Sequence, residues 1–293
     1  YNGEDKLQGM SEMLQKMGIT VNAYLPAADL QTIKKAPRAA LNIVRRKKWA
    51  LAMEQRFGTP FLHVADMQEW HGIEGISDLY RQIGKMLGCE DAVERVLQAE
   101  YERVAARYYE LRAEFAKHKF CLIAHGIAYL PDALRVYQQD YGLPIKKICI
   151  IMNPSYQAET GLDDAMMQRF KDRIELAKAE YGCEAEILLE PSAEALREAA
   201  QSCDFVICNG HPRYASLNVP VLYNLFDRSV WSYQGFVDIM EEVWQMLQRP
   251  QRTGSSLLLS KLAYDPVFYP MREADKDSKA SRELYSRVWR QRK

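Results

Sequence analysis

The chain has 293 residues, a length that accommodates about two domains, each with its own core. Its 39 basic and 39 acidic side chains balance, so the sequence lacks the basic excess that nucleic-acid-binding proteins normally carry. No apolar run approaches the ~20 residues that cross a bilayer, and no signal-peptide pattern opens the chain. We therefore expect no nucleic-acid partner and no membrane partner.

Helical and extended patterns alternate along the first 88 residues. The predicted helices cover residues 6–18, 27–37 and 72–88, with one more that begins at Arg45. The predicted strands cover residues 19–25, 39–44 and 60–64. Such alternation is typical of parallel sheets covered by helices, so we expect residues 1–88 to form a first Rossmann-like α/β lobe.

Residues 90–119 contain no Gly or Pro and are rich in Glu, Arg, Ala and Leu. The stretch is acidic at its start and basic at its end, which is the charge order that the helix macrodipole favours. It is predicted to form one long helix. We assign residues 89–118 as a helical connector between two α/β lobes.

The alternation resumes after the connector, so residues 119–249 are predicted to form a second Rossmann-like lobe. Its predicted strands cover residues 119–126, 146–153, 184–191, 204–210 and 220–224. Its predicted helices cover residues 130–142, 162–182, 192–202 and 235–248. The remaining residues, 250–293, are more polar and basic and are assigned to a C-terminal arm. The predicted fold is thus α/β, with two Rossmann-like lobes that contain parallel sheets and are joined by a long helix.

The six cysteines contain no pair at CxxC spacing. Three of them, Cys121, Cys149 and Cys208, lie inside apolar runs, where a free cysteine behaves as a small core residue. This usage is typical of a reduced compartment and offers no cysteine-rich metal site. We therefore expect a cytoplasmic protein without a metal site of its own.

Polar residues and glycines follow three strands of the second predicted lobe. They are His125, Gly126, Asn153, Asn209, Gly210 and His211. Ligands of doubly wound sheets bind at the carboxyl ends of the strands, so the set predicts a binding rim. Imidazoles donate protons near neutral pH, which makes the two histidines candidate catalytic residues and the other four candidate substrate contacts. Alternatively, these residues supply only turns and surface, and two histidines fall short of a usual metal site.

The segment "LNIVRRKKWALAMEQRFG" places four consecutive cations, residues 45–48, at the start of a helix. A helix N-terminus carries partial positive charge and favours anions, so these cations need water, an acidic partner or a ligand. Consecutive helical side chains diverge by about 100°, so only two of the four could face one ligand. We take Arg45 and Arg46 as candidate contacts for an anionic substrate; a solvated patch or an acidic partner subunit is the alternative.

Taken in order, several segments resemble the nitrogenase component 1 type oxidoreductases. The resemblance rests on "YNGEDKLQGMSEMLQKMGITVNAYLP", "TIKKAPRAALNIV", "RFGTPFLHV", "GIEGISDLYRQIGKMLG" and "FVICNGHPRYASLNVPVLYNLFDRSVWSYQG". It covers nearly the whole chain through the order and spacing of these segments. No GxGxxG, P-loop, HExxH or GxSxG motif accompanies them.

The resemblance implies partners and a cofactor outside this chain. Members of the family pair with a second component-1-type subunit and receive electrons from an ATP-dependent iron–sulfur reductase. Their iron–sulfur cluster lies at a subunit interface and is held by an N-terminal domain, which we expect this sequence to lack. We therefore expect this chain by itself to bind no cofactor.

The departures from the family define the functional hypotheses. After "LNLV" the catalytic nitrogenase subunit supplies a cysteine ligand to its large metal cluster, whereas this chain has Arg45 and Arg46, which cannot ligate a metal. The late histidine ligand of that subunit would fall near Asn224 and Leu225. We therefore expect a nitrogenase-like oxidoreductase subunit that reduces a substrate other than dinitrogen, such as an anionic tetrapyrrole. The alternatives are a non-catalytic binding or scaffold protein for a metallocofactor precursor or tetrapyrrole, and a structural partner subunit.

Overall fold

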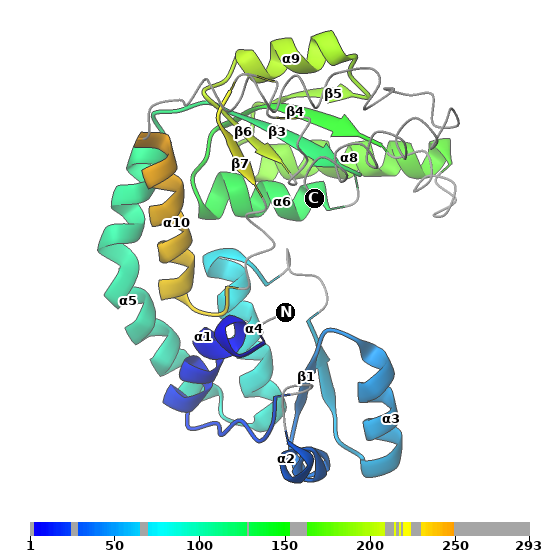
Figure 1. Cartoon of the computed structure of the whole chain (residues 1–293), viewed down its shortest axis with the longest axis vertical. Helices are drawn as coiled ribbons and strands as arrows, with labels where there is room; N and C mark the ends of the chain where they lie inside the picture. The colour runs from blue at the N-terminus through cyan, green and yellow to red at the C-terminus, as the bar shows by residue number, and fades with distance from the viewer. Residues whose placement is uncertain are drawn as a thin grey trace, which may run out of the picture.

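The computed structural model describes residues 3–24, 29–64, 70–127, 129–152, 163–208, 214, 217, 219–223 and 230–248. A smaller and a larger α/β lobe lie at opposite ends of the long axis, and three helices run along one side between them (Figure 1). Within the described ranges, no helix has both the length and the apolar character needed to cross a membrane.

The smaller lobe contains a two-stranded parallel sheet and three helices. Its elements are α1 (Gly3–Lys16), α2 (Leu30–Lys35), the 3-10 turn η1 (Ala36–Arg38), β1 (Asn42–Val44), α3 (Lys47–Phe57) and β2 (Phe61–His63). Val44 pairs with His63, so the two strands end side by side. The first helix stops where predicted, because Gly18 adopts a φ of +80°.

The strand predicted over residues 19–25 is wrong across its described part, since residues 19–24 form no strand. Ile19 and Val21 do pack against the core, which accounts for the alternating apolar pattern. In the described part of the chain, no strand pairs with this segment. The Asn22 side-chain amide instead donates to the Lys35 carbonyl at 2.7 Å, tying the segment to α2.

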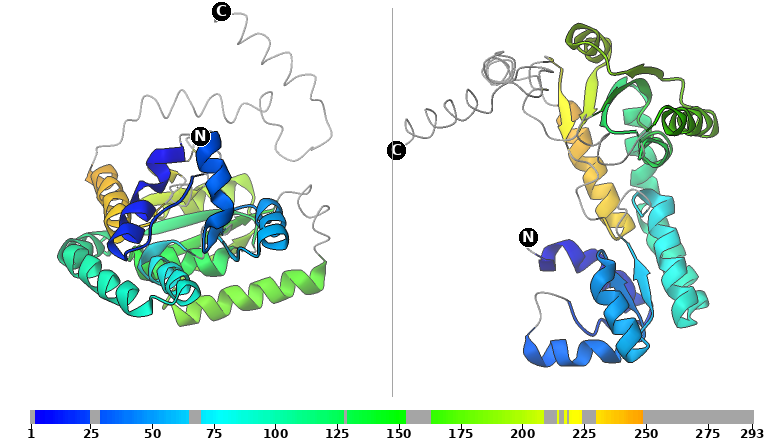
Figure 2. Two further views of the ribbon diagram at one scale, coloured as in Figure 1. Left: turned by 90° about the horizontal axis from the view of Figure 1, so that it is seen from below. Right: turned by 90° about the vertical axis from the view of Figure 1, so that its right-hand side faces the viewer.

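Three long helices form the side of the molecule that joins the lobes: α4 (Gly72–Leu87), α5 (Glu90–Phe115) and α10 (Tyr233–Gln248). The predicted long helix is confirmed and ends at Phe115. Both orientations of the ribbon show α10 alongside α5 (Figures 1 and 2). Arg107 of α5 forms a two-bond ion pair with Glu241 of α10. The chain therefore returns from the larger lobe to pack on the connecting helix.

The larger lobe is a doubly wound α/β unit. Its elements are β3 (Phe120–His125), α6 (Leu130–Leu134), the π-helix η2 (Arg135–Asp140), β4 (Ile145–Ile151), α8 (Asp164–Glu180), β5 (Glu186–Leu189), α9 (Ala193–Gln201), β6 (Phe205–Cys208) and β7 (Val221–Tyr223). The strands are all parallel, in the order β5-β4-β3-β6-β7. The α/β prediction with parallel sheets is confirmed.

Side chains of β3 alternate between the two faces of this sheet, as an extended chain requires. Cys121 and Ile123 pack with α9 on one face, whereas Phe120 and Leu122 join the core that includes α6 and α8. The strand order reverses between β3 and β6, which creates a topological switch point at their carboxyl ends.

Candidate functional site

The switch point of the five-stranded sheet carries a histidine held by two tyrosines. His125 is the last residue of β3, and its Nε2 lies 2.5 Å from the hydroxyl oxygen of Tyr214, which follows β6. The His125 backbone N–H donates to the Tyr129 hydroxyl oxygen at 3.1 Å. Tyr214 is fully buried, whereas His125 is half-buried. The fold thus fixes one imidazole where ligands of such sheets bind.

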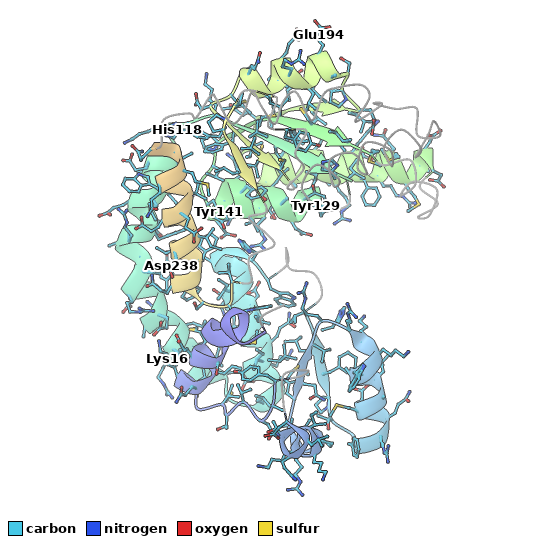
Figure 3. The ribbon with its side chains drawn as sticks, in the orientation of Figure 1. Lys16, His118, Tyr129, Tyr141, Glu194 and Asp238 are labelled. Atoms are coloured by element: carbon cyan, nitrogen blue, oxygen red, sulfur yellow. The ribbon has the colours of Figure 1, made fainter. Side chains whose placement is uncertain are left out.

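Burial also disfavours ionisation of Tyr129. It raises the pKa of Tyr129 to about 12, although the hydrogen bond from His125 acts in the opposite direction. Tyr129 therefore remains a neutral phenol at physiological pH. Figure 3 places it on the side of the larger lobe that is nearer to the smaller lobe.

Gly126 turns the chain away from the sheet directly after His125. Its φ of +103° lies in the region that favours glycine, and its backbone N–H donates to the Ile151 carbonyl at 3.0 Å. Gly126 therefore has a structural role in directing the loop, and its predicted contact with substrate stays a prediction.

Glu190, which was not predicted from the sequence, joins the carboxyl ends of β4 and β5. It has a φ of +48°, and its carboxylate accepts a hydrogen bond from the Met152 N–H. Its own N–H donates to the Ile150 carbonyl at 2.8 Å. Positive φ costs a non-glycine residue of the order of 1 kcal/mol or more, so these contacts stabilise a strained backbone at the rim. No sequence signal marks a glutamate for this conformation.

The basic run lies at the carboxyl end of β1 in the smaller lobe. Arg45 and Arg46 are exposed, and Arg46 precedes the first turn of α3 without a side-chain capping bond. In the described part of the chain, neither arginine takes part in an ion pair. Their binding of an anionic substrate stays a prediction. Four other predicted rim residues lie outside the described residues: Asn153, Asn209, Gly210 and His211.

A second polar cluster, which the sequence analysis missed, lies where α4 meets the larger lobe. His71 is 1% exposed, and its Nε2 lies 3.0 Å from the Tyr141 hydroxyl oxygen. Burial, together with the charge of Arg135, lowers the pKa of His71 to about 3, so the imidazole is neutral. The Arg135 guanidinium also donates to the His71 carbonyl at 3.2 Å. The only sequence signal was a His-Gly pair before a helix.

Asp140 completes this cluster from the end of the π-helix. Its carboxylate accepts hydrogen bonds from the N–H groups of Ile73 and Glu74 at the start of α4, and lies 3.1 Å from Arg135 Nη1. Burial raises the pKa of Asp140 to about 7 against the effects of Arg135 and these N–H groups. The cluster therefore caps α4 and fixes it to the larger lobe.

A polar hollow of about 640 Å³ lies beside Arg135 and not at His125. It is lined by Glu74, Asp78, Arg112, Asp132, Arg135, Gln138, Gln139, Glu180 and Tyr181. The polar hollow beside Arg135 and the rim at His125 are therefore two separate polar regions. We base the candidate site on His125, because the topology of the sheet and the fixed imidazole coincide there.

The cysteines do not fit an iron–sulfur cluster. Five of the six are buried, and Cys121, Cys149, Cys203 and Cys208 lie in one apolar cluster under α9. The sulfurs of Cys121 and Cys149 lie 4.0 Å apart. Among the residues that the structure describes, no three metal-ligating side chains are grouped so as to hold an ion. A cluster is therefore not assigned to the described part of this chain.

The fold is that of solved nitrogenase chains. Two structures, titled "Nitrogenase Cp1 at pH 6.5" and "Nitrogenase Cp1 at pH 5", each match with a TM-score of 0.56. They are 15% and 16% identical to this chain, and each match covers 85% of it. The matches cover 57% and 55% of the solved chains, so this chain spans less than two thirds of their length.

The sequence places the chain within a family. The family model described as Nitrogenase component 1 type Oxidoreductase matches residues 1–248, and the chain belongs to this family. The predicted resemblance is confirmed. A comparison with curated proteins finds no match.

Proposed function

We propose that this chain is a subunit of a nitrogenase-like oxidoreductase that reduces a substrate other than dinitrogen. Electrons would come from an iron–sulfur cluster held outside this chain, supplied by an ATP-dependent iron–sulfur reductase. A second component-1-type subunit would complete the assembly. The observation that carries the proposal is family membership over residues 1–248.

The proposed chemical role of this chain is to bind substrate and deliver protons. His125 supports this role because hydrogen bonds fix both its ring and its backbone at the switch point. A general acid acts within hydrogen-bond reach of its acceptor, so an imidazole in fixed position is suited to protonate a reduced substrate. Arg45 and Arg46 are exposed at the carboxyl end of β1, and their guanidinium groups suit a substrate that bears carboxylates.

Native mass spectrometry with iron and sulfide analysis tests the assembly. The full-length protein would be purified anaerobically from its own host, so that partners and cofactors stay bound. We expect iron, acid-labile sulfide and a second subunit. A metal-free monomer would contradict the proposal. A protein that carries a cofactor precursor or tetrapyrrole but accepts no electrons would favour the scaffold function instead.

Substitution of His125 tests the site. In the reconstituted complex, we expect His125→Asn to slow reduction of the co-purified substrate about 100-fold, the lower range for loss of a general acid. His118→Asn is the matched control, because His118 lies at the opposite end of β3, after α5 (Figure 3). Equal activity of the two variants would remove His125 from the mechanism.

A further inference from the structure

The smaller lobe contains a strongly basic segment within a chain of zero net charge. Residues 29–64, here named the basic segment, hold eight Lys or Arg and two Asp or Glu, a net charge of +6. Its cations are Lys34, Lys35, Arg38, Arg45, Arg46, Lys47, Lys48 and Arg56. Exposed charges of this sign attract acidic groups over about a Debye length.

The basic segment also exposes large apolar side chains. Leu30 of α2 is 73% exposed and Trp49 of α3 is 70% exposed. Of the residues in α3, Ala50 alone is buried, and α2 buries none. Two helices that bury so little, and combine cations with an exposed tryptophan, have the composition of an interface.

The opposite charge is concentrated at one edge of the larger lobe. Residues 184–198, here named the acidic edge, hold five glutamates and one arginine, a net charge of −4. They include β5, the edge strand of the sheet, where Leu189 is 38% exposed. Two of the glutamates pair with Lys146 and Lys147 of β4, and the edge stays negative when these lysines are counted.

The basic segment and the acidic edge lie at opposite ends of the molecule. In Figure 1, α2 and α3 are at one end of the long axis, and β5 and α9 are at the other. Glu194 of α9 marks the far end in Figure 3. The two surfaces of one chain therefore cannot meet, but two antiparallel chains can bring them together.

We propose that the basic segment docks on the acidic edge of a second copy of this chain. A two-fold axis would form the contact twice, at both ends of the pair, and would leave neither surface unmatched. Exposed Trp49 and Leu30 would supply apolar contact area, and the complementary charges would set the orientation. Lys47 and Lys48 would carry the charged contact and leave Arg45 and Arg46 to the proposed substrate, since consecutive helical side chains diverge by about 100°. Failure of one proposal therefore leaves the other standing.

Sedimentation velocity on the full purified chain tests the pairing. At about 100 µM protein and about 50 mM salt we expect a dimer, and in about 1 M salt dissociation, because the Debye length falls to about 3 Å. Lys47→Glu with Lys48→Glu is expected to raise the dimer Kd about tenfold or more. Glu194→Lys with Glu198→Lys is expected to do the same from the other side of the contact.

Mixing the two charge-reversed variants distinguishes this interface from any other. In the mixed pair, one contact joins the two reversed surfaces, which are complementary again, and the other contact joins the two unchanged surfaces. We therefore expect dimerisation to return. Lys171→Glu with Arg173→Glu is the matched control on exposed positions of α8, and is expected to leave the dimer intact. The control replaces two cations by two glutamates, so its change in net charge equals that of the first variant.

Four results would overturn the proposal. The first is a monomer at every salt concentration, and the second is a dimer that neither charge reversal weakens. The third is loss of the dimer without recovery on mixing, which would show a general charge effect. Monomers that bind vesicles of phosphatidylcholine and phosphatidylglycerol through the basic segment would assign that surface to lipid and likewise refute the second copy.

Discussion

At the scale of single residues, the junction between α4 and the larger lobe depends on the absence of one side chain. Gly72 has a φ of +82°, and a Cβ there would lie 2.0 Å from Asp140 Oδ2. The carboxylate can cap α4 only because this space is empty. Glycine at this position is therefore required twice, by the backbone conformation and by the close approach of a buried acid.

We expect Gly72→Ala to destabilise the chain by more than about 3 kcal/mol, because left-handed strain adds to displacement of a buried carboxylate. Urea unfolding measures the change. Gly88→Ala is the matched control: its φ is +67°, but no atom lies within 4 Å of the added Cβ. The control should lose only the backbone cost of about 1–2 kcal/mol. Equal losses would mean that Asp140 does not occupy this space.

His71 and Asp140 make opposite contributions to stability as the pH changes. Between pH 3.8 and 6.5 the folded chain keeps Asp140 protonated and His71 neutral, because burial raises the first pKa to about 7 and lowers the second to about 3. The unfolded chain ionises the aspartate and protonates the histidine in the same range. The free energy of unfolding therefore loses the contribution of Asp140 as the pH rises through this range. It loses the contribution of His71 as the pH falls through the same range.

We therefore expect the two slopes, each about 1.4 kcal/mol per pH unit, to cancel in the wild type and to appear in the single variants. Stability of Asp140→Asn should rise between pH 3.8 and 6.5 relative to wild type, and stability of His71→Gln should fall. Chemical denaturation at several pH values measures both slopes. Parallel profiles for wild type and both variants would show that neither group changes its proton affinity on folding.

At the scale of helices and strands, α10 is tied to α5 by a side-chain pair with two hydrogen bonds. Arg107 Nε lies 2.5 Å from Glu241 Oε1, and Arg107 Nη2 lies 2.9 Å from Glu241 Oε2. The guanidinium also lies over the Trp244 ring at 5.5 Å. Two parallel bonds fix the geometry better than a single contact does, so the pair should couple the helices even though both side chains are partly exposed.

Double-mutant cycles with alanine test this link. We expect a coupling of about 1 kcal/mol for Arg107 with Glu241, since the contact joins two helices with paired bonds. Arg107 with Glu110 is the matched cycle, because this pair is within α5 and has one bond at 2.9 Å. Its coupling should be about 0.3–0.5 kcal/mol. A larger value for Glu110 would mean that the helix-to-helix contact contributes little.

The sequence predicted the elements whose signal is local. Strands β3, β4 and β6 are apolar runs because both faces of the parallel sheet are buried, and His125 was found because it ends such a run. The predicted helix over residues 130–142 is instead α6 followed by the π-helix that ends at Asp140. The π-helix ends at Asp140, whose carboxylate contacts α4. Because α4 is distant from Asp140 in the sequence, the helical period of residues 130–142 cannot reveal this contact.

The sequence did not reveal the side-chain contacts of His125, or those of the cluster around His71 and Asp140, for the same reason. Tyr214 lies three residues after His211 of the predicted rim but was not itself predicted there, and only the fold brings its hydroxyl to His125. His71 and Asp140 belong to different lobes in the predicted scheme and meet through packing of α4. The basic run was visible as charge in the sequence, and the structure adds that Arg45 and Arg46 are exposed.

At the scale of the whole molecule, the packing of the two lobes is unequal. The main core runs from α1 through α4, α5 and α10 into β3 and β4. Within the basic segment, the buried residues are few: Ala36, Ala50, Thr59, Leu62 and Val64. Apolar burial is the main stabilising term in folding, so the β1-α3-β2 unit adds little of its own. It depends on its contacts with the rest of the chain.

Hydrogen exchange monitored by mass spectrometry should show this difference as local opening of the smaller lobe. We expect amides of β1, α3 and β2 to exchange at least about 100-fold faster than those of β3, β4 and β6, because local opening needs less free energy than global unfolding. The exchange should be measured in about 1 M salt, because salt at this concentration screens the charge attraction of the proposed pairing. The 3-10 turn and β1 can be compared with α9, an exposed element of the larger lobe that packs on the sheet. If β1 and β2 exchange as slowly as β3, opening of the two lobes is cooperative and the smaller lobe is not an independent unit.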